Sequence, residues 1–272
     1  MDKGLKIKSI DQEILHMIEN HQAYIYATHK KSLHMNVCNT LITIGDLIPE
    51  GKHHIVINQH IVFNTLGLEM NQPIYIKDSY LYIKDMAFKI DNGAIKDYKS
   101  YDSTYVKTKK LDDIINQLFI LIDKNIHEEM FIKYNTNIIK TVTNRVNQFL
   151  KTPTLNNALL ILGLGQGLTP YGDDVLVGYV MGRNTIGYPI EWIENLIDIV
   201  DKKTTKLSAQ NIKDTNARIY PHIYVDMIEE LFNKNKIEHA KALMEIGDTS
   251  GVGMLLGFLH GIKAGERDNE RF

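Results

Sequence analysis

The sequence predicts an α+β protein in which an N-terminal β-rich domain, a small antiparallel sheet or barrel at residues 1–105, precedes a mostly helical C-terminal domain at residues 106–272. Short runs of β-branched and aromatic residues recur from Ala23 to about Tyr101, which is typical of strands. Beyond Lys107, apolar residues recur instead at the three- and four-residue spacing of amphipathic helices.

The N-terminal elements follow from these spacings. Apolar residues at helical spacing predict one short helix from Ile10 to His21. Because Asn-Gly accepts positive φ at little cost, Asp91 to Gly93 is expected to form a hairpin turn. Strands are expected around six runs, which begin at Tyr24, Leu41, Ile55, Ile74, Leu81 and Ala87.

The C-terminal domain is expected to begin with a helical region from Leu111 to Leu150, which Pro153 ends. The stretch from Ile246 to Ile262 is the most apolar, but it is too short and too rich in glycine to span about 30 Å of hydrocarbon, so it predicts a buried helix. Helices are expected at residues 170–183, 190–213, 221–233, 236–246 and 250–264.

The composition excludes several classes of protein. With 272 residues, 44% hydrophobic composition and a formal net charge of −2, the chain has a normal core and lacks the basic field that a nucleic-acid partner requires. The single cysteine, Cys38, rules out a disulfide framework, and no charged-then-apolar leader opens the chain. We therefore expect a cytoplasmic protein with no membrane span, no nucleic-acid partner and no metal or cofactor.

A glycine-rich loop, Gly163 to Asp174, is the strongest candidate for a functional site. Thr169 is expected to cap a helix whose first residue is Pro170, and glycines let a ligand approach the N–H groups at such a terminus. A phosphate or carboxylate is therefore expected to bind among the loop residues Gly165, Gln166, Gly167, Leu168 and Thr169. The alternative is a tight turn that serves only packing.

Two adjacent acids, Asp173 and Asp174, stand in the first turn of this helix. Their side chains point about 100° apart, so one can bind the backbone while the other stays available for a substrate amide, a proton or a metal. A purely structural reason for both is the favourable interaction of carboxylates with the helix dipole.

The glycine spacing after this loop recurs near the C-terminus. The segments Gly172–Gly182 and Gly251–Gly261 share it, and Thr249, Ser250 and Gly251 stand where the second segment begins. We expect two helices that pack closely through their glycines, with both N-termini converging on one ligand. The alternative is a helix pair that serves only packing.

A third group of hydroxyl residues, Thr204, Thr205 and Ser208, falls within the helix expected at residues 190–213. Threonine and serine are poor residues for a helix interior, which indicates contacts that favour them. Helical spacing would place Thr204 and Ser208 on one face. A solvated helix end explains them equally well.

Together, these three motifs resemble a family long catalogued as a domain of unknown function. That family includes the smallest subunit of oxamate carbamoyltransferase, from anaerobic allantoin breakdown. The resemblance covers most of residues 155–262, and the loop departs from the family pattern at Gln166 and Tyr171, as does Gly253 in the second segment.

The resemblance implies a subunit of a carbamoyltransferase that moves a carbamoyl group between carbamoyl phosphate and an amide or amine acceptor such as oxamate, together with other carbamoyltransferase subunits. It implies catalytic roles for Asp173 and Asp174. The alternative is a non-catalytic assembly subunit, in which the glycine helices contact partner chains. A stand-alone metal-dependent hydrolase that uses the two aspartates with His222 or His260 is disfavoured, because no histidine stands at a recognisable ligand spacing from the aspartates. Substrate-binding roles are implied for Gly165, Gln166, Gly167, Leu168, Thr169, Thr204, Thr205, Ser208, Thr249, Ser250 and Gly251.

Overall fold

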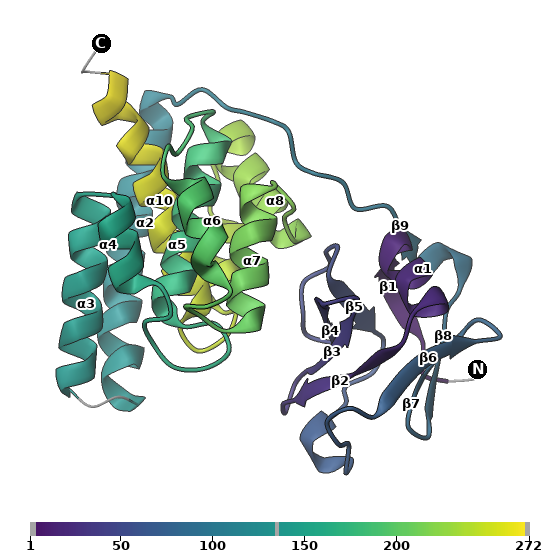
Figure 1. The fold of residues 1–272 in the computed structure, drawn as a ribbon. Coiled ribbons are helices and arrows are strands. Elements are labelled where there is room, and N and C mark those ends of the chain that lie inside the picture. The colour runs from purple at the N-terminus through teal and green to yellow at the C-terminus, as the bar shows by residue number, and fades with distance from the viewer. Residues whose placement is uncertain (1–3, 134–135, 270–272) are drawn as a thin grey trace. The chain divides into compact units, whose positions relative to one another are not determined.

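The computed structural model describes residues 4–133 and 136–269 (Figure 1). The chain divides into two compact units. One comprises the residues up to Ser100 together with Ile219–His222, and the other comprises Tyr101–Arg218 and the residues from Ile223 onward. The first unit is built on a sheet and the second on helices, so the predicted α+β fold class is confirmed.

The N-terminal unit contains a curled sheet of nine strands among the described residues, in the order β8-β7-β6-β2-β3-β4-β5-β1-β9. Lys89 at the end of β8 donates its N–H to the carbonyl of Leu5, just before β1, at 2.9 Å, which gives the sheet its half-barrel form. The strands are β1 (Ile7–Asp11), β2 (Ala23–Thr28), β3 (Leu33–Val37), β4 (Thr40–Gly45), β5 (His54–Ile57), β6 (Pro73–Lys77), β7 (Tyr80–Ile83), β8 (Met86–Lys89) and β9 (Ile95–Lys96).

The sheet is mixed, which corrects the expectation of an antiparallel one. β4 pairs with β5 in parallel, as does β1 with β9, and the other named pairs are antiparallel. A parallel pair needs a connection longer than a tight turn, and residues 46–53 provide one between β4 and β5. Such non-local pairing leaves no mark on the local alternation of residues.

The tight turns lie elsewhere than predicted. Cys38 and Asn39 both have positive φ between β3 and β4, as do Asp78 and Ser79 between β6 and β7. The predicted hairpin at residues 91–93 is wrong, because the chain there forms the 3₁₀ helix η2 (Asn92–Ala94) and continues into β9, which pairs with β1.

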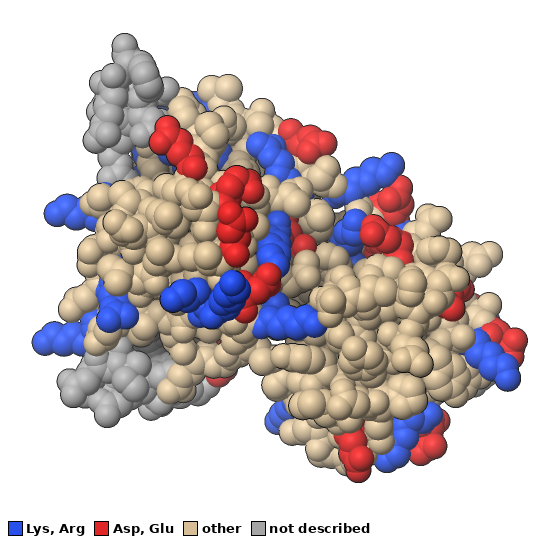
Figure 2. Space-filling view, in the orientation of Figure 1, with Lys and Arg blue, Asp and Glu red and all other residues tan. Residues whose placement is uncertain are grey.

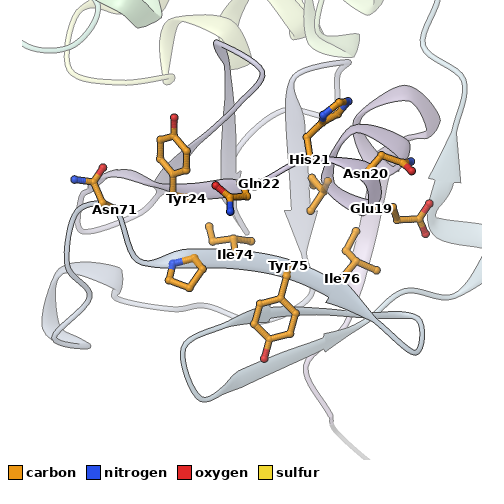
Figure 3. Close-up of a pocket in the computed structure, with 12 residues that line it drawn as sticks. Glu19, Asn20, His21, Gln22, Tyr24, Asn71, Ile74, Tyr75 and Ile76 are labelled. Carbon is orange, nitrogen blue, oxygen red and sulfur yellow. The ribbon is translucent and has the colours of Figure 1, made fainter.

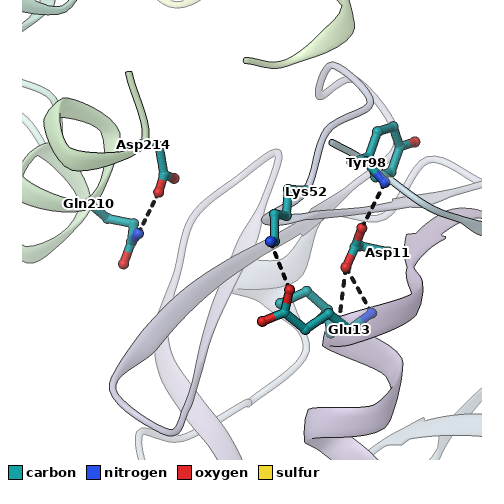
Figure 4. Close-up of polar contacts among 7 residues, drawn as sticks. Asp11, Glu13, Lys52, Tyr98, Gln210 and Asp214 are labelled. Carbon is teal, nitrogen blue, oxygen red and sulfur yellow. Dashed lines mark hydrogen bonds and ion pairs between the residues drawn. The ribbon is translucent and has the colours of Figure 1, made fainter. Parts of the chain in front are cut away.

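A short helix, α1 (Gln12–Asn20), follows β1 and confirms the helix predicted at the start of the chain. Asp11 caps it: its Oδ1 accepts the N–H groups of Glu13 at 2.9 Å and Ile14 at 3.3 Å, and its Oδ2 accepts that of Tyr98 at 3.1 Å (Figure 4). One carboxylate thus joins the start of the helix to the segment after β9. The buried residues Ile14 and Ile18 of α1 belong to the apolar core of this unit.

A groove of about 550 Å³ lies in the same unit, between the end of α1 and strands β2 and β6 (Figure 3). Its lining includes the amides of Asn20, Gln22 and Asn71 and the rings of Tyr24 and Tyr75. None of the predicted site residues lines this groove. The 3₁₀ helix η1 (Phe63–Thr65) also belongs to this unit.

The C-terminal unit is built around α5, whose residues from Tyr171 to Arg183 are all buried. The only tryptophan, Trp192, stacks on Tyr179 of this helix with 6.4 Å between ring centroids. The helices are α2 (Lys109–Lys133), α3 (Thr136–Lys151), α4 (Leu155–Ile161), α5 (Tyr171–Thr185), α6 (Ile193–Val200), α7 (Lys206–Asn216), α8 (His222–Glu229), the π-helical turn η3 (Glu230–Lys234), α9 (Glu238–Met244) and α10 (Ser250–Asn269).

The single helix predicted at residues 190–213 is wrong, because the structure has α6 and α7 with a break between them. Thr205 caps α7 by accepting the N–H of Ser208 on its hydroxyl at 3.1 Å. A threonine hydroxyl competes for backbone N–H groups in this way, which favours a new helix start over continuation. Along α7, the Gln210 amide donates to Asp214 at 2.7 Å (Figure 4).

Surface charge and helix length relate to two expectations from the sequence, the lack of a basic field for nucleic acid and the lack of a membrane span. On the face shown in Figure 2, basic and acidic side chains are interspersed. Within the described ranges, no helix combines the length and apolar character needed to cross a membrane.

Candidate functional site

The helices α5 and α10 cross through their glycines. A Cβ added to Gly178 would lie 1.9 Å from the carbonyl oxygen of Met254, and one added to Gly257 would lie 2.1 Å from that of Val175. These distances are far below van der Waals contact, so the two backbones touch where side chains are missing. The prediction of two helices packed through a shared glycine spacing is confirmed.

The two helices run in the same direction. Gly178 lies against Met254, and Gly182, one turn later, lies against Phe258, also one turn later. The N-terminal ends of α5 and α10 are therefore at the same end of the pair. This is the arrangement that the repeated segments predicted.

The second residue of each helix is a glycine packed against the helix before it. A Cβ on Gly172 would lie 2.0 Å from the carbonyl oxygen of Ile161 in α4, and one on Gly251 would lie 1.8 Å from that of Leu243 in α9. The loop from Gly163 to Thr169 separates α4 from α5, whereas a shorter turn separates α9 from α10. The repeat is thus structural, and the long loop is a feature of its first copy.

Asp173 holds this loop in place. Its Oδ1 accepts the N–H of Gly163 at 2.6 Å, and its Oδ2 accepts the hydroxyl of Thr204. Burial raises the pKa of the Asp173 carboxyl, against the lowering effect of hydrogen bonds from Thr204, Gly163 and Ser208. One of the two adjacent acids therefore binds the backbone, as expected for such a pair.

Thr205 fastens the other end of the loop. Its hydroxyl donates to the carbonyl oxygen of Leu168 and also caps α7. The three hydroxyl residues were predicted to lie within one helix, but they lie around the N-terminus of α7. Thr204 precedes this helix, Thr205 caps it and Ser208 lies in its first turn. Their contacts explain why hydroxyl side chains stand at these positions.

Thr169 does not cap α5, contrary to the prediction. Pro170 occupies the cap position with ψ of 140°, and its carbonyl oxygen accepts the N–H groups of Asp173 and Asp174. The Thr169 hydroxyl instead forms a hydrogen bond with the hydroxyl of Ser250, the first residue of α10, at 2.9 Å. This bond joins the starts of the two helices.

The loop has backbone N–H donors without partners between its two attachments, which Asp173 makes at Gly163 and Thr205 makes at Leu168. In the described part of the chain, the N–H groups of Gly165, Gln166, Gly167 and Leu168 make no hydrogen bond within the protein, and residues 165–167 are exposed. Gly165 and Gly167 have φ of 135° and 88°, which glycine adopts readily and other residues rarely do. The N–H of Gly251, by contrast, already donates to the carbonyl of Ile246 at 3.0 Å.

Asp174 is the acid that lies between the helices. Its side chain is buried with 1% of the residue exposed, and its Oδ2 has no hydrogen-bond partner among the described residues. Burial raises the pKa of this carboxyl well above its ordinary value, the hydrogen bond from Ser250 lowers it, and the charge of Asp173 raises it. The carboxyl is therefore held in its protonated form more strongly than an exposed aspartate.

The surroundings of Asp174 include residues that the sequence reasoning missed. A Cβ on Gly253 would lie 3.2 Å from the Asp174 Cβ and 2.9 Å from the ring of Tyr171, so the ring fills the space of a side chain at position 253. Tyr224 of α8 donates its hydroxyl to the sulfur of Met254 at 2.6 Å, and burial and the Asp174 charge raise its pKa. Only the apolar pattern of residues 221–233 marked Tyr224 in the sequence.

The site combines loop N–H groups that lack a partner with a buried carboxyl at Asp174. Thr249 contributes its carbonyl oxygen, which accepts the N–H of Gly253 at 2.9 Å. Where side chains are described, no group of three or more histidine, cysteine, aspartate and glutamate side chains is placed to hold a metal ion. The described residues bring together N–H donors, hydroxyls and two buried carboxyls at this end of the helix pair.

One of the comparisons with known proteins finds a match in this region of the chain. No curated protein and no solved structure matches the chain. A family model does match, and its range contains the loop, both glycine helices and the hydroxyl residues between them. The resemblance inferred from the three motifs is thereby confirmed: residues 161–262 match the family described as oxamate carbamoyltransferase subunit AllH.

Proposed function

We propose that this chain is a catalytic subunit of a carbamoyltransferase, in which the Gly165–Leu168 N–H groups bind phosphate and Asp174 exchanges the proton of the acceptor nitrogen. The observation that carries the proposal is a buried carboxyl without a partner at Oδ2, at the end of the helix pair where the exposed loop begins. The family match to an oxamate carbamoyltransferase subunit supports the reaction class.

The loop suits the phosphate group of carbamoyl phosphate. Adjacent N–H groups without internal partners, next to the N-terminus of the fifteen-residue helix α5, favour an anion through hydrogen bonds and the helix dipole. Asp173 is already bound to Gly163 and Thr204, so its role is to shape this loop.

Asp174 suits proton exchange with an amide nitrogen. In the direction that forms carbamoyl phosphate, a phosphate oxygen attacks the carbamoyl carbon and the bond from that carbon to the acceptor nitrogen breaks. The electron pair goes to the nitrogen, which takes a proton from Asp174. Burial raises the pKa of this carboxyl and so favours the protonated form that a general acid requires, and general acid catalysis typically contributes about 10²–10⁴-fold in rate.

The alternative, an assembly subunit whose glycine helices contact partner chains, has weaker support. The glycines of α5 and α10 pack on each other within this chain, so that face is not offered to a partner. Other carbamoyltransferase subunits remain the proposed partners, with oxamate as the proposed acceptor.

The test measures carbamoyl phosphate formation and binding with the partner subunits present. Asp174→Asn is expected to keep phosphate binding and lose turnover about 10²–10⁴-fold. Gly167→Val is expected to lose phosphate binding, because a β-branched residue is strained at φ of 88°. The matched control is Asp198→Asn, which changes an exposed aspartate of α6 in the same way. Full activity in both site variants would reject the catalytic role in favour of assembly.

A further inference from the structure

Three helices begin around the last two residues of the loop. Pro170, directly after Thr169, is the cap residue of α5. The Thr169 hydroxyl lies 2.9 Å from that of Ser250, the first residue of α10. The carbonyl of Leu168 accepts the hydroxyl of Thr205, which caps α7. The N-terminal ends of α5, α7 and α10 therefore meet at the end of the loop.

The meeting of three helix starts favours a negative ligand. The N-terminus of a helix carries the equivalent of roughly half a positive charge, because its first N–H groups lack partners and its peptide dipoles are aligned. With 15, 11 and 20 residues, α5, α7 and α10 are all long enough for this effect. The buried Oδ2 of Asp174, in the first turn of α5, has no partner among the described residues, so the chain itself does not satisfy every polar group at this end.

A phosphate bound at this loop also needs a positive side chain, because Asp173 holds the same loop. Both oxygens of Asp173 accept hydrogen bonds, one from the Gly163 N–H at 2.6 Å and one from the Thr204 hydroxyl, which is the arrangement of an ionised carboxylate. A carboxylate disfavours a second negative group near it. Lysine and arginine are the residues that commonly bind phosphate through charge-assisted hydrogen bonds.

The segment that leads into α7 runs along the loop and ends in a lysine. A Cβ added to Gly163, at the start of the loop, would lie 2.5 Å from the carbonyl oxygen of Lys203. Two residues later, Thr205 binds Leu168 at the end of the loop. Lys206 comes next, as the first residue of α7, so it lies at the end of the loop where the last N–H group without a partner is found.

Lys206 differs from the other lysines of this segment in its surroundings. Lys202 and Lys203 are exposed, whereas Lys206 is half-buried, and burial lowers the pKa of its ammonium while the charge of Asp201 raises it. Asp201 forms an ion pair with Lys213, whose Nζ lies 2.7 and 2.6 Å from the two carboxylate oxygens. A partly desolvated ammonium gains more from a bound anion than a fully solvated one does.

We propose that Lys206 is the cationic residue of the phosphate site, and that its ammonium binds the phosphate held by the N–H groups of Gly165–Leu168. The flexible four-carbon stem of lysine lets the ammonium extend from the start of α7 toward these groups. The inference rests on the proposed function and adds to it a residue that none of the sequence motifs marked as charged and functional. Its role is to bind phosphate, so it requires no access of substrate to Asp174.

The decisive comparison is Lys206→Gln against Lys206→Arg and Lys202→Gln, measured as phosphate affinity by calorimetry with the partner subunits present. Loss of the charge is expected to weaken binding about 10–100-fold, and to raise the KM for phosphate more than it lowers kcat. Arginine keeps the charge and is expected to retain most of the affinity. Lys202→Gln removes an exposed charge from the same segment and is expected to change the affinity less than about threefold.

Acylation of the native complex tests direct contact. Modified lysines are identified by mass spectrometry, and phosphate is expected to slow the acylation of Lys206 without slowing that of Lys202. A lysine with a purely structural role would react at the same rate with and without phosphate.

The outcomes separate the role of Lys206 from the function beneath it. Loss of phosphate binding in Gly167→Val, with native affinity in Lys206→Gln, would overturn the role of Lys206 and leave the proposed function standing. Equal losses in Lys206→Gln and Lys202→Gln would also overturn it, since the overall charge of the segment would then be responsible. A native complex that binds no phosphate would remove both proposals. Trp192 fluorescence tests whether each variant folds, and the acylation of the native complex decides the question if Lys206→Gln does not.

Discussion

Replacing Gly257 by alanine places a methyl group where α5 and α10 cross. Its carbon would lie 2.1 Å from the carbonyl oxygen of Val175 and 2.8 Å from the nitrogen of Tyr179. Non-bonded heavy atoms need roughly 3.5 Å, so the helices would have to separate by about 1 Å. Both obstructing atoms belong to the backbone of a helix that is buried from Tyr171 to Arg183, and this backbone cannot yield as a flexible side chain does.

The magnitude follows from two opposing effects. Overpacking a close-packed interior costs about 1–3 kcal/mol, and the upper end applies to a backbone contact. Alanine regains about 1 kcal/mol of helix propensity relative to glycine. We expect Gly257→Ala to lower the free energy of unfolding of the C-terminal unit by about 2 kcal/mol.

Urea unfolding followed by Trp192 fluorescence measures this unit, because the only tryptophan stacks on Tyr179 of α5. If the free energy of unfolding falls by about 2 kcal/mol for each molar of urea, the urea concentration at the midpoint of unfolding should fall by about 1 M. Gly93→Ala is the control, since a methyl group there would meet nothing within 4 Å. Equal midpoints for the two variants would refute the crossing as described.

Three further predictions concern pH and capping. Because the pKa of Asp174 is higher in the folded protein than in the unfolded chain, stability should fall as pH rises above about 4, and urea midpoints from pH 5 to 8 should fall less for Asp174→Asn than for the native chain. Thr205→Val should cost about 1–2 kcal/mol by the same fluorescence assay, since it loses the α7 cap and the bond to Leu168, and a cost no larger than that of Thr152→Val would contradict this. Burial lowers the pKa of His34 to about 4, so the N-terminal unit should lose stability as pH falls from about 6.5 toward 4. His34→Gln should flatten that loss when amide signals of the unit are followed by NMR.

The local patterns of the chain were enough to predict its two kinds of structure. Alternation and β-branched runs predict strands because a strand's period is two, and the four-residue spacing of Gly178, Gly182, Gly257 and Gly261 predicts a close crossing because it places the gaps on one helix face. Partners far apart in sequence were beyond such patterns. The parallel pairing of β1 with β9 depends on the whole path of the chain between them.

The features of the site also fall into two groups, those that residue types predicted and those that depend on tertiary packing. That the chemistry centres on the loop and the two aspartates was readable from residue types, because glycines, helix starts and adjacent acids have local physical consequences. Which acid binds the backbone and which keeps a carboxylate oxygen without a partner depends on what packs against each side of α5. Asp173 meets Gly163 and Thr204, whereas Asp174 lies beside Ser250 and Gly253 of α10. Only the packing of these distant segments separates two residues that are equivalent in the sequence.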